Sequence, residues 1–164
     1  MSDKQITDNR PLMSDEQLSV LEAEFMERYK GSEKHPIRTL LSFYNTPAFT
    51  DDLLVDWYKS LWEHGHRLST RHRIGNWLIM EMNGLGHIGI LYPQFRTSAA
   101  WLRQAIASLE KELDDQVYPD GFQYELSTEY QQVVISNYST VVRSLKAYGR
   151  PVNPEVLKCL ENLL

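Results

Sequence analysis

Hydrophobic residues recur at helical spacing along most of the chain, and this pattern predicts a series of α-helices. Residues with capping side chains or N-terminal proline place helix starts near residues 50, 76, 98, 128 and 154. No segment alternates apolar and polar residues in the manner of a half-buried strand. The connections are short, and short connections make consecutive helices antiparallel. The pattern therefore predicts an all-α fold built from antiparallel helical hairpins.

Local signals set the expected boundaries. Ser14–Gln17 has the form of a capping box ahead of an apolar set, and Thr128–Gln131 has the same form. Tyr118–Gly121 is typical of a turn, and Gly149 is a C-terminal helix stop. Residues 1–12 are polar and are expected to form a disordered lead-in. The sequence thus predicts one helical segment over residues 13–164.

The helix predicted after Asn76 differs from the one that follows it. Residues 77–92 are apolar on nearly all sides, which is typical of a buried helix, and three glycines there predict a close approach by a neighbour. The next helix has one apolar stripe, with three charged residues expected outside. The stripe is Leu102, Ile106, Leu109 and Leu113, and the charged residues are Lys111, Glu112 and Asp114. This helix is expected to lie on the outside.

Two helices separated by one antiparallel helix run parallel, so their N-termini lie at the same end. Asn76 precedes one N-terminus and Tyr130 lies in the first turn of the other. We therefore expect both to open onto one rim, because packed helices lie about 8–10 Å apart. Free N–H groups at both ends favour anions and would help a tyrosine act as a base. The neighbouring run of Arg71, His72 and Arg73 would strengthen that field.

Composition narrows the function classes. The net charge of −5 gives no global field for nucleic acid, and no apolar stretch is long enough to span a membrane. The start of the chain lacks the apolar core of a secretory signal. Cys159 is the one cysteine, and its setting predicts a small buried side chain. No cluster has the spacing of a metal site, so neither metal nor cofactor is expected.

Three segments carry a resemblance to a known family. They are Ser69–Trp77, Leu91–Phe95 and Gln116–Tyr130, and the last is the most specific: a Pro-Asp-Gly turn, then Glu-Leu-Ser, then a tyrosine that opens a helix. Over residues 47–148 the chain resembles heparinase II/III polysaccharide lyases. The resemblance implies part of an (α/α) toroid that binds an acidic polysaccharide, of the heparan sulfate or alginate kind, and acts on it by β-elimination beside a uronic acid.

The resemblance also implies roles for residues. Asn76 takes the role of the asparagine that neutralises the substrate carboxylate, and Tyr130 that of the tyrosine that shares the base and acid roles with a histidine. Substrate contacts are expected from Arg71, His72, Arg73, Trp77 and Glu125. The family often has a histidine after the motif tyrosine, where this chain has Gln131, and the family's catalytic histidine has no matching position. The chain is expected to lack the rest of the toroid and a β-sandwich, and to carry part of an enzyme site.

Other interpretations of the same residues stay open. Asn76 could be an N-cap only, and Tyr130 and Trp77 could be core residues. Glu81 and Glu125 could hold Asn76 and the turn in place, or could form the acid–base pair of a glycoside hydrolase on a similar toroid. His87 is expected to be a satisfied core histidine.

A third function class also stays open for the chain as a whole: a catalytically silent helical module that binds sugar or a partner protein. An exposed apolar edge of a partial toroid predicts a homodimer. The resemblance implies a bacterial periplasmic or secreted protein.

Overall fold

The computed structural model describes residues 14, 16, 17, 20, 46, 47 and 49–163. Over residues 49–163 it contains five helices: α3 (Asp51–Thr70), α4 (Asn76–Leu91), α5 (Ser98–Gln116), α6 (Thr128–Ala147) and α7 (Pro154–Leu163). Within the described residues there is an isolated bridge between Val117 and Gln123 and no strand. The predicted all-α fold is confirmed, and each of the five helices begins at or beside its predicted residue. The lead-in of residues 1–12 lies outside the described residues.

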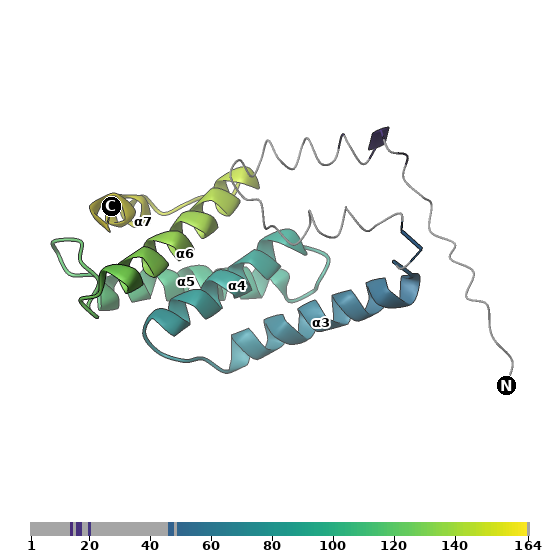
Figure 1. Cartoon of the computed structure of the whole chain (residues 1–164), viewed down its shortest axis with the longest axis horizontal. Coiled ribbons are helices and arrows are strands. Elements are labelled where there is room, and N and C mark those ends of the chain that lie inside the picture. Colours follow the sequence, from purple (N-terminus) through teal and green to yellow (C-terminus); the bar gives the residue numbers. More distant parts are fainter. Residues whose placement is uncertain (1–13, 15, 18–19, 21–45, 48, 164) are drawn as a thin grey trace, which may run out of the picture. The chain divides into compact units, whose positions relative to one another are not determined.

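The contacts divide the chain into two compact units, Met1–Ser60 and Leu61–Leu164, and the boundary falls within α3. In the second unit α4, α5 and α6 are consecutive antiparallel helices, and α4 packs on both α5 and α6. Figure 1 shows α4 and α6 running in the same direction, so that both begin at the end where the α3–α4 connection lies. α7 packs on α5 and α6. The parallel arrangement expected of the helices that begin near residues 76 and 128, which are α4 and α6, is therefore present.

The interior of the second unit is built around α4. The side chains of Ile79, Met82 and Leu85 are fully buried there, and Ala105 of α5 and Val134 of α6 are equally inaccessible. Gly89 permits the close approach of α5: a Cβ at this position would lie 2.9 Å from Cβ of Leu102 and 2.9 Å from the carbonyl oxygen of Ser98. The close approach predicted from the glycines of this segment is thus confirmed at Gly89.

α5 is rotated relative to the prediction. Its buried face contains Trp101, Ala105, Leu109, Glu112, Leu113 and Gln116, whereas Leu102 and Ile106 are only half-buried. The prediction that Glu112 lies outside is wrong, because its side chain is 8% exposed. The amide of Gln116 donates a hydrogen bond to the Glu112 carboxylate, which supplies the partner that a buried carboxylate requires.

Capping groups explain why most helices start where they do. Thr50 Oγ1 accepts from the backbone N–H of Leu53, 3.2 Å away, at the start of α3. Asn153 Oδ1 accepts from the N–H of Glu155, at 3.0 Å, at the start of α7. The box at Ser14 is also formed, with reciprocal bonds between Ser14 and Gln17 of 2.9 and 3.1 Å. α5 differs, since Thr97 occupies the N-cap position without a side-chain capping bond.

A polar seam joins α4 to α6. The carbonyl oxygen of Asn83 lies 2.8 Å from Nδ1 of His87, and the hydroxyl of Ser144 lies 2.9 Å from Nε2. A carbonyl only accepts, so Nδ1 carries the proton and Nε2 accepts from Ser144. Asn83 Nδ2 belongs to the same seam and donates to Oδ1 of Asn137 at 2.6 Å. The prediction of a satisfied histidine at position 87 is confirmed.

His87 predicts a loss of stability in mild acid. Its burial lowers the pKa of the imidazole below the ordinary value of 6.5, although the bond to Asn83 acts in the opposite direction. The folded chain therefore binds this proton less readily than the unfolded chain does. The neutral imidazole of His87 therefore contributes to the free energy of unfolding. This contribution is fully present above pH 6.5 and is lost as the pH falls through 6.5 toward the pKa of the folded state.

The measurement is the free energy of unfolding in urea, taken at intervals between pH 8 and pH 5, the range in which histidine titrates. His87→Gln keeps a polar side chain and should show a shallower fall than the wild type. His72→Gln, at an exposed position, is the control and should follow the wild type. Parallel curves for His87→Gln and the wild type would contradict the interpretation.

Candidate functional site

The N-terminal ends of α4 and α6 meet at one end of the second unit (Figure 1). Nδ2 of Asn76, the first residue of α4, donates to Oε2 of Glu125 across 3.4 Å. Glu125 stands three residues before Thr128, where α6 begins. This bond spans the two helix starts, so Asn76 and the first turn of α6 lie at the same end, as predicted.

Asn76 is not an N-cap. The N-cap of α4 is Gly75, whose φ of 68° and ψ of −149° lie in a region that is essentially restricted to glycine. Asn76 follows as the first helical residue and its side chain is only 7% exposed. The capping interpretation of Asn76 is therefore wrong. Its amide is a buried polar group that is aimed at Glu125 instead of at the helix backbone.

Tyr130 is also not a core residue, because 45% of it is exposed in the first turn of α6. Its backbone N–H donates to Oγ of Ser127, 3.4 Å away. Ser127 is therefore the N-cap, and the predicted box that begins at Thr128 is wrong by one residue. The extended backbone of Ser127 suits a capping residue, and the side chain of Gln131 is used elsewhere.

Three glutamines hold the segment that leads into α6, and nothing in the sequence pattern singles out two of them, Gln116 and Gln123. Gln131 Oε1 accepts from the N–H of Gln123 at 2.8 Å, and Gln131 Nε2 donates to the carbonyl oxygens of Gly121 and Leu163. The side chain of Gln123 is completely buried, and its Oε1 accepts from the N–H of Glu125 at 2.9 Å. The backbone carbonyl oxygen of Gln116 accepts from the N–H of Tyr124 at 2.8 Å, and its side-chain Oε1 accepts from Nε2 of Gln123 at 3.5 Å. The position of Glu125 is thus fixed from both sides.

Of the three glutamines, Gln131 alone is marked in the sequence, because it stands where the family motif often has a histidine. A histidine offers two ring nitrogens, whereas Gln131 uses one acceptor and two donors toward three different backbone groups. This side chain ties the turn at Gly121 and the end of α7 to α6. Nothing in the spacing of Gln116 and Gln123 marked them, because their roles depend on partners distant in the chain.

The basic residues predicted for substrate contact are exposed beside Asn76. Arg71, His72 and Arg73 are all exposed in the connection between α3 and α4. The guanidinium of Arg73 lies over the ring of Trp77 at 5.6 Å, and Trp77 is 58% exposed. The core interpretation of Trp77 is wrong, because more than half of the residue is exposed. Nε2 of His72 lies 3.4 Å from Nε2 of Gln104.

The two carboxylates considered for a hydrolase each serve a structural bond. Oε2 of Glu81 accepts from the backbone N–H of Arg73 at 2.8 Å, which holds the α3–α4 connection onto α4. Glu125 binds Asn76. Glu125 therefore holds Asn76, as one interpretation of the sequence predicted, whereas Glu81 holds the α3–α4 connection and not Asn76 itself.

Tyr124, next to Glu125, was not anticipated. A Cβ placed on Gly75 would lie 2.8 Å from the hydroxyl oxygen of Tyr124 and 3.6 Å from Oε1 of Glu125. Desolvation of the phenol raises the pKa of Tyr124, and the charges of Glu125 and Glu112 and a hydrogen bond with Glu125 raise it further. Tyr124 is therefore a neutral phenol that can donate to the carboxylate.

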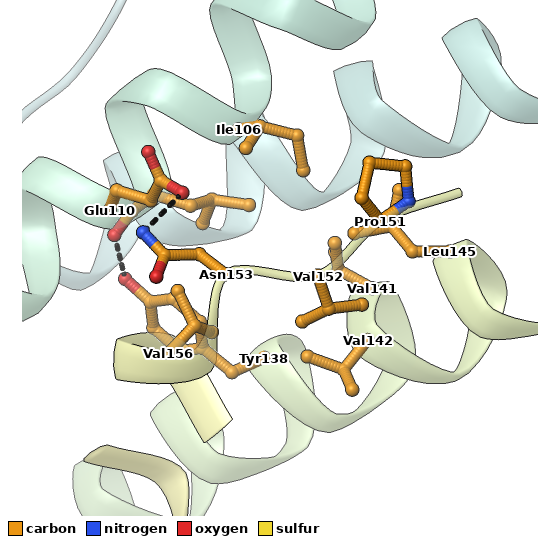
Figure 2. A pocket seen from close by; sticks show the side chains of 11 residues that line it. Ile106, Glu110, Tyr138, Val141, Val142, Leu145, Pro151, Val152, Asn153 and Val156 are labelled. Carbon is orange, nitrogen blue, oxygen red and sulfur yellow. Dashed lines mark hydrogen bonds between the residues drawn. The ribbon is translucent and has the colours of Figure 1, made fainter. Parts of the chain in front are cut away.

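Two hollows of the second unit lie away from these residues and suit no acidic polymer. One has a volume of about 30 Å³ and is lined mainly by apolar side chains of α5, α6 and the segment before α7, with the Asn153–Glu110 hydrogen bond of 3.0 Å at its edge (Figure 2). The other, of about 390 Å³, lies between α5 and α7, and its lining includes the carboxylates of Glu110, Asp114 and Glu155. The first is too small for a sugar, and the second has the wrong charge.

The described residues contain no group of three or more His, Cys, Asp or Glu side chains arranged to hold a metal ion. A helix long and apolar enough to cross a membrane is likewise not found among them. Cys159 is a free thiol that is half-buried in α7, and burial raises its pKa.

Comparison with known proteins bears on both fold and site. The family model for the heparinase II/III N-terminus matches residues 23–154. The chain is similar to a heparin-sulfate lyase of Pedobacter heparinus, with 35% identity over 112 residues that make up 68% of this chain and 16% of that protein. It is also similar to a heparin-sulfate lyase of Bacteroides stercoris, with 30% identity over 65% of this chain and 16% of that protein. The chain thus spans about a sixth of the length of these relatives.

Solved structures of a heparan sulfate lyase and of a heparinase III are similar to this chain in fold. The crystal structure of heparan sulfate lyase HepC from Pedobacter heparinus aligns with a TM-score of 0.63 at 30% identity, over 76% of this chain and 20% of that one. A heparinase III structure aligns with a TM-score of 0.64 at 27% identity, over 77% of this chain and 20% of the other. The antiparallel hairpins therefore form part of a helical toroid, as predicted. On the family match and these relatives, the chain belongs to the heparinase II/III family and corresponds to its N-terminal region.

Proposed function

We propose that this chain supplies one wall of the cleft of a polysaccharide lyase that cleaves a heparan sulfate-like polymer by β-elimination. The observation that carries the proposal is the buried amide of Asn76, held by Glu125 at the helix end where Tyr130 is exposed. The names of the relatives, heparin-sulfate lyase and heparan sulfate lyase, support the class of substrate.

Asn76 is assigned to the substrate carboxylate. An amide nitrogen carries two N–H groups, and the bond to Glu125 uses one of them. The second can donate to the carboxylate of a uronic acid, whose negative charge grows as the neighbouring C5 proton leaves. Stabilising charge that develops in the transition state is the largest single contribution in many enzymes. The free N–H groups at the start of α4 act in the same direction.

Tyr130 is assigned to proton transfer. A base removes the C5 proton, the C4–O bond breaks, a C4–C5 double bond forms, and the departing oxygen takes up a proton. Tyr130 is exposed in the first turn of α6, and we propose that a substrate held at Asn76 reaches its phenol. The resemblance gives the second acid–base group to a histidine, which we propose lies in the part of such lyases that this chain does not match.

The remaining predicted residues are assigned to binding. The exposed indole of Trp77 offers a flat surface for a sugar ring, and the guanidinium of Arg73 lies 5.6 Å from the centre of the same indole. Arg71, His72 and Arg73 offer cationic or hydrogen-bonding groups to sulfates and carboxylates of the polymer. The relatives named above are bacterial proteins, and we propose a periplasmic or secreted location.

The test follows ultraviolet absorbance, which reports the conjugated product, while the chain is mixed with heparan sulfate or with alginate. Calorimetry with heparan sulfate is run in parallel, because the chain can bind without turning over. We expect heparan sulfate to bind, and any absorbance rise to be abolished by Tyr130→Phe. Tyr118→Phe is the matched control, because Tyr118 is exposed to a similar extent, 48%, and lies in the preceding turn. Absence of both binding and absorbance change with heparan sulfate would overturn the proposal.

A further inference from the structure

The carboxylate of Glu125 faces two polar groups at the start of α4. Its Oε2 takes the amide of Asn76 at 3.4 Å. Its Oε1 and the hydroxyl of Tyr124 lie on the same side of Gly75, at 3.6 and 2.8 Å from the point where a Cβ would stand. The proximity of Tyr124 and the Glu125 carboxylate is consistent with the raised pKa of Tyr124, to which Glu125 contributes. The two oxygens of one carboxylate therefore face two different side chains.

The hydroxyl of Tyr124 reaches this point because residue 75 has no side chain. The backbone of Tyr124 is anchored separately, by the bond from its N–H to the carbonyl oxygen of Gln116 at 2.8 Å. The residue as a whole is 40% exposed. The polar end of the side chain thus lies at the helix start, while the base of the residue is fixed to the end of α5.

The backbone is strained at Leu126, the residue that follows Glu125. Leu126 has a φ of 54°, a left-handed conformation that is unusual for a non-glycine residue, and its side chain is largely exposed. Its N–H donates to the carbonyl oxygen of Gln123 at 3.0 Å, which closes a tight turn over Gln123–Leu126. Strain of this kind persists only where surrounding contacts impose it, and it clusters at functional sites.

We propose that Tyr124 is a positioning residue for Asn76. Its hydroxyl holds one oxygen of the Glu125 carboxylate, so that the other oxygen fixes the amide of Asn76 with one N–H engaged and the second directed to a uronate carboxylate. This inference rests on the proposed function for the identity of the ligand. The arrangement of the three side chains is independent of it.

The first experiment needs no sugar. The side-chain amide of Asn76 gives a pair of ¹H–¹⁵N signals, identified by their loss in Asn76→Ala. In Tyr124→Phe we expect this pair to move toward the positions of a free asparagine amide, because the carboxylate that holds it has lost a donor. In Tyr118→Phe, an exposed tyrosine of the same connection, the pair should stay in place. Unchanged signals in Tyr124→Phe, or an equal change in both variants, would overturn the proposal.

A second experiment connects the arrangement to binding. The affinity for a heparan sulfate tetrasaccharide is expected to fall roughly fivefold to tenfold in Tyr124→Phe, the cost of weakening one bond to a charged group, and to stay unchanged in Tyr118→Phe. Circular dichroism and the thermal midpoint confirm that both variants fold. If the wild type does not bind the tetrasaccharide, the proposed function fails, and the amide signals alone decide whether Tyr124 positions Asn76.

Discussion

On the proposed lyase function, Asn76→Asp is expected to abolish elimination more completely than Asn76→Ala, although aspartate is much closer in shape to asparagine. Removing one donor from a site that stabilises developing negative charge costs about 100- to 1000-fold in rate, which is the expected loss for Asn76→Ala. Aspartate removes the same donor and adds a charge that repels the substrate carboxylate. If Asn76 served only to fill space at the start of α4, the order would be reversed. The initial rate of absorbance increase on heparan sulfate measures both variants.

Asn76→Asp is also expected to destabilise the fold at neutral pH. It places a second carboxylate against Glu125, across the gap of 3.4 Å that the amide now bridges, at a position that is only 7% exposed. Two carboxylates this close cannot both ionise freely, so the pKa of the pair rises above the unfolded value, and a rise of about 2 units costs about 3 kcal/mol. This cost is absent below the ordinary pKa of a carboxyl group and appears in full only above the raised pKa. Urea unfolding should therefore show a smaller deficit at pH 4 than at pH 7.5.

Asn153→Asp provides a matched control. Asn153 makes the same kind of bond, from Nδ2 to Oε1 of Glu110 at 3.0 Å, but it is exposed to solvent. Aspartate caps a helix as well as asparagine does, so the start of α7 should be preserved. Water screens the new pair of carboxylates, and the expected loss of stability is below about 1 kcal/mol. An equal loss for both variants would contradict the view that Asn76 and Glu125 form a special buried pair.

The sequence predicted the helices well because their ends are set by local chemistry. Thr50, Asn153 and Gly149 act on backbone groups within a few residues of themselves, and a capping side chain or a left-handed glycine can be recognised without knowing the fold. The meeting of the two helix starts was predictable for a related reason. Short connections fix the alternation of direction, and the parallel relation of α4 and α6 follows from that alone.

Burial of polar residues could not be predicted in the same way. A charged residue in a charged run usually faces water, which predicts that Glu112 lies outside, yet Glu112 is buried with Gln116 as its partner. Gln123 is completely buried, and its partners Gln131 and Gln116 come from the helices on either side. Such residues are indistinguishable from surface polar residues until the partners are known. The same limit applies to Tyr124, because its hydroxyl lies beside Gly75, which stands 49 residues earlier in the chain.

Gly75→Ala is expected to be among the most damaging small substitutions at the site. The φ of 68° and ψ of −149° at Gly75 are unfavourable for any residue with a side chain, at a cost of about 1–3 kcal/mol. The new Cβ would also lie 2.8 Å from the hydroxyl oxygen of Tyr124. Alanine should therefore both destabilise the fold and displace Tyr124 from Glu125. The free energy of unfolding in urea and the Asn76 amide signals measure the two effects separately.

Two further variants separate the backbone cost from the steric cost. Gly149→Ala introduces a side chain at a φ of 63° with no atom within 4 Å of the new Cβ, so it reports the cost of positive φ in open space, about 1 kcal/mol. Combining Gly75→Ala with Tyr124→Phe removes the hydroxyl oxygen, and the nearest ring carbon, Cζ, then lies 4.0 Å away. The double variant should accordingly lose less stability than the sum of the two single variants. Strict additivity would show that Tyr124 does not press against Gly75, and the contact on which its positioning role depends would be absent.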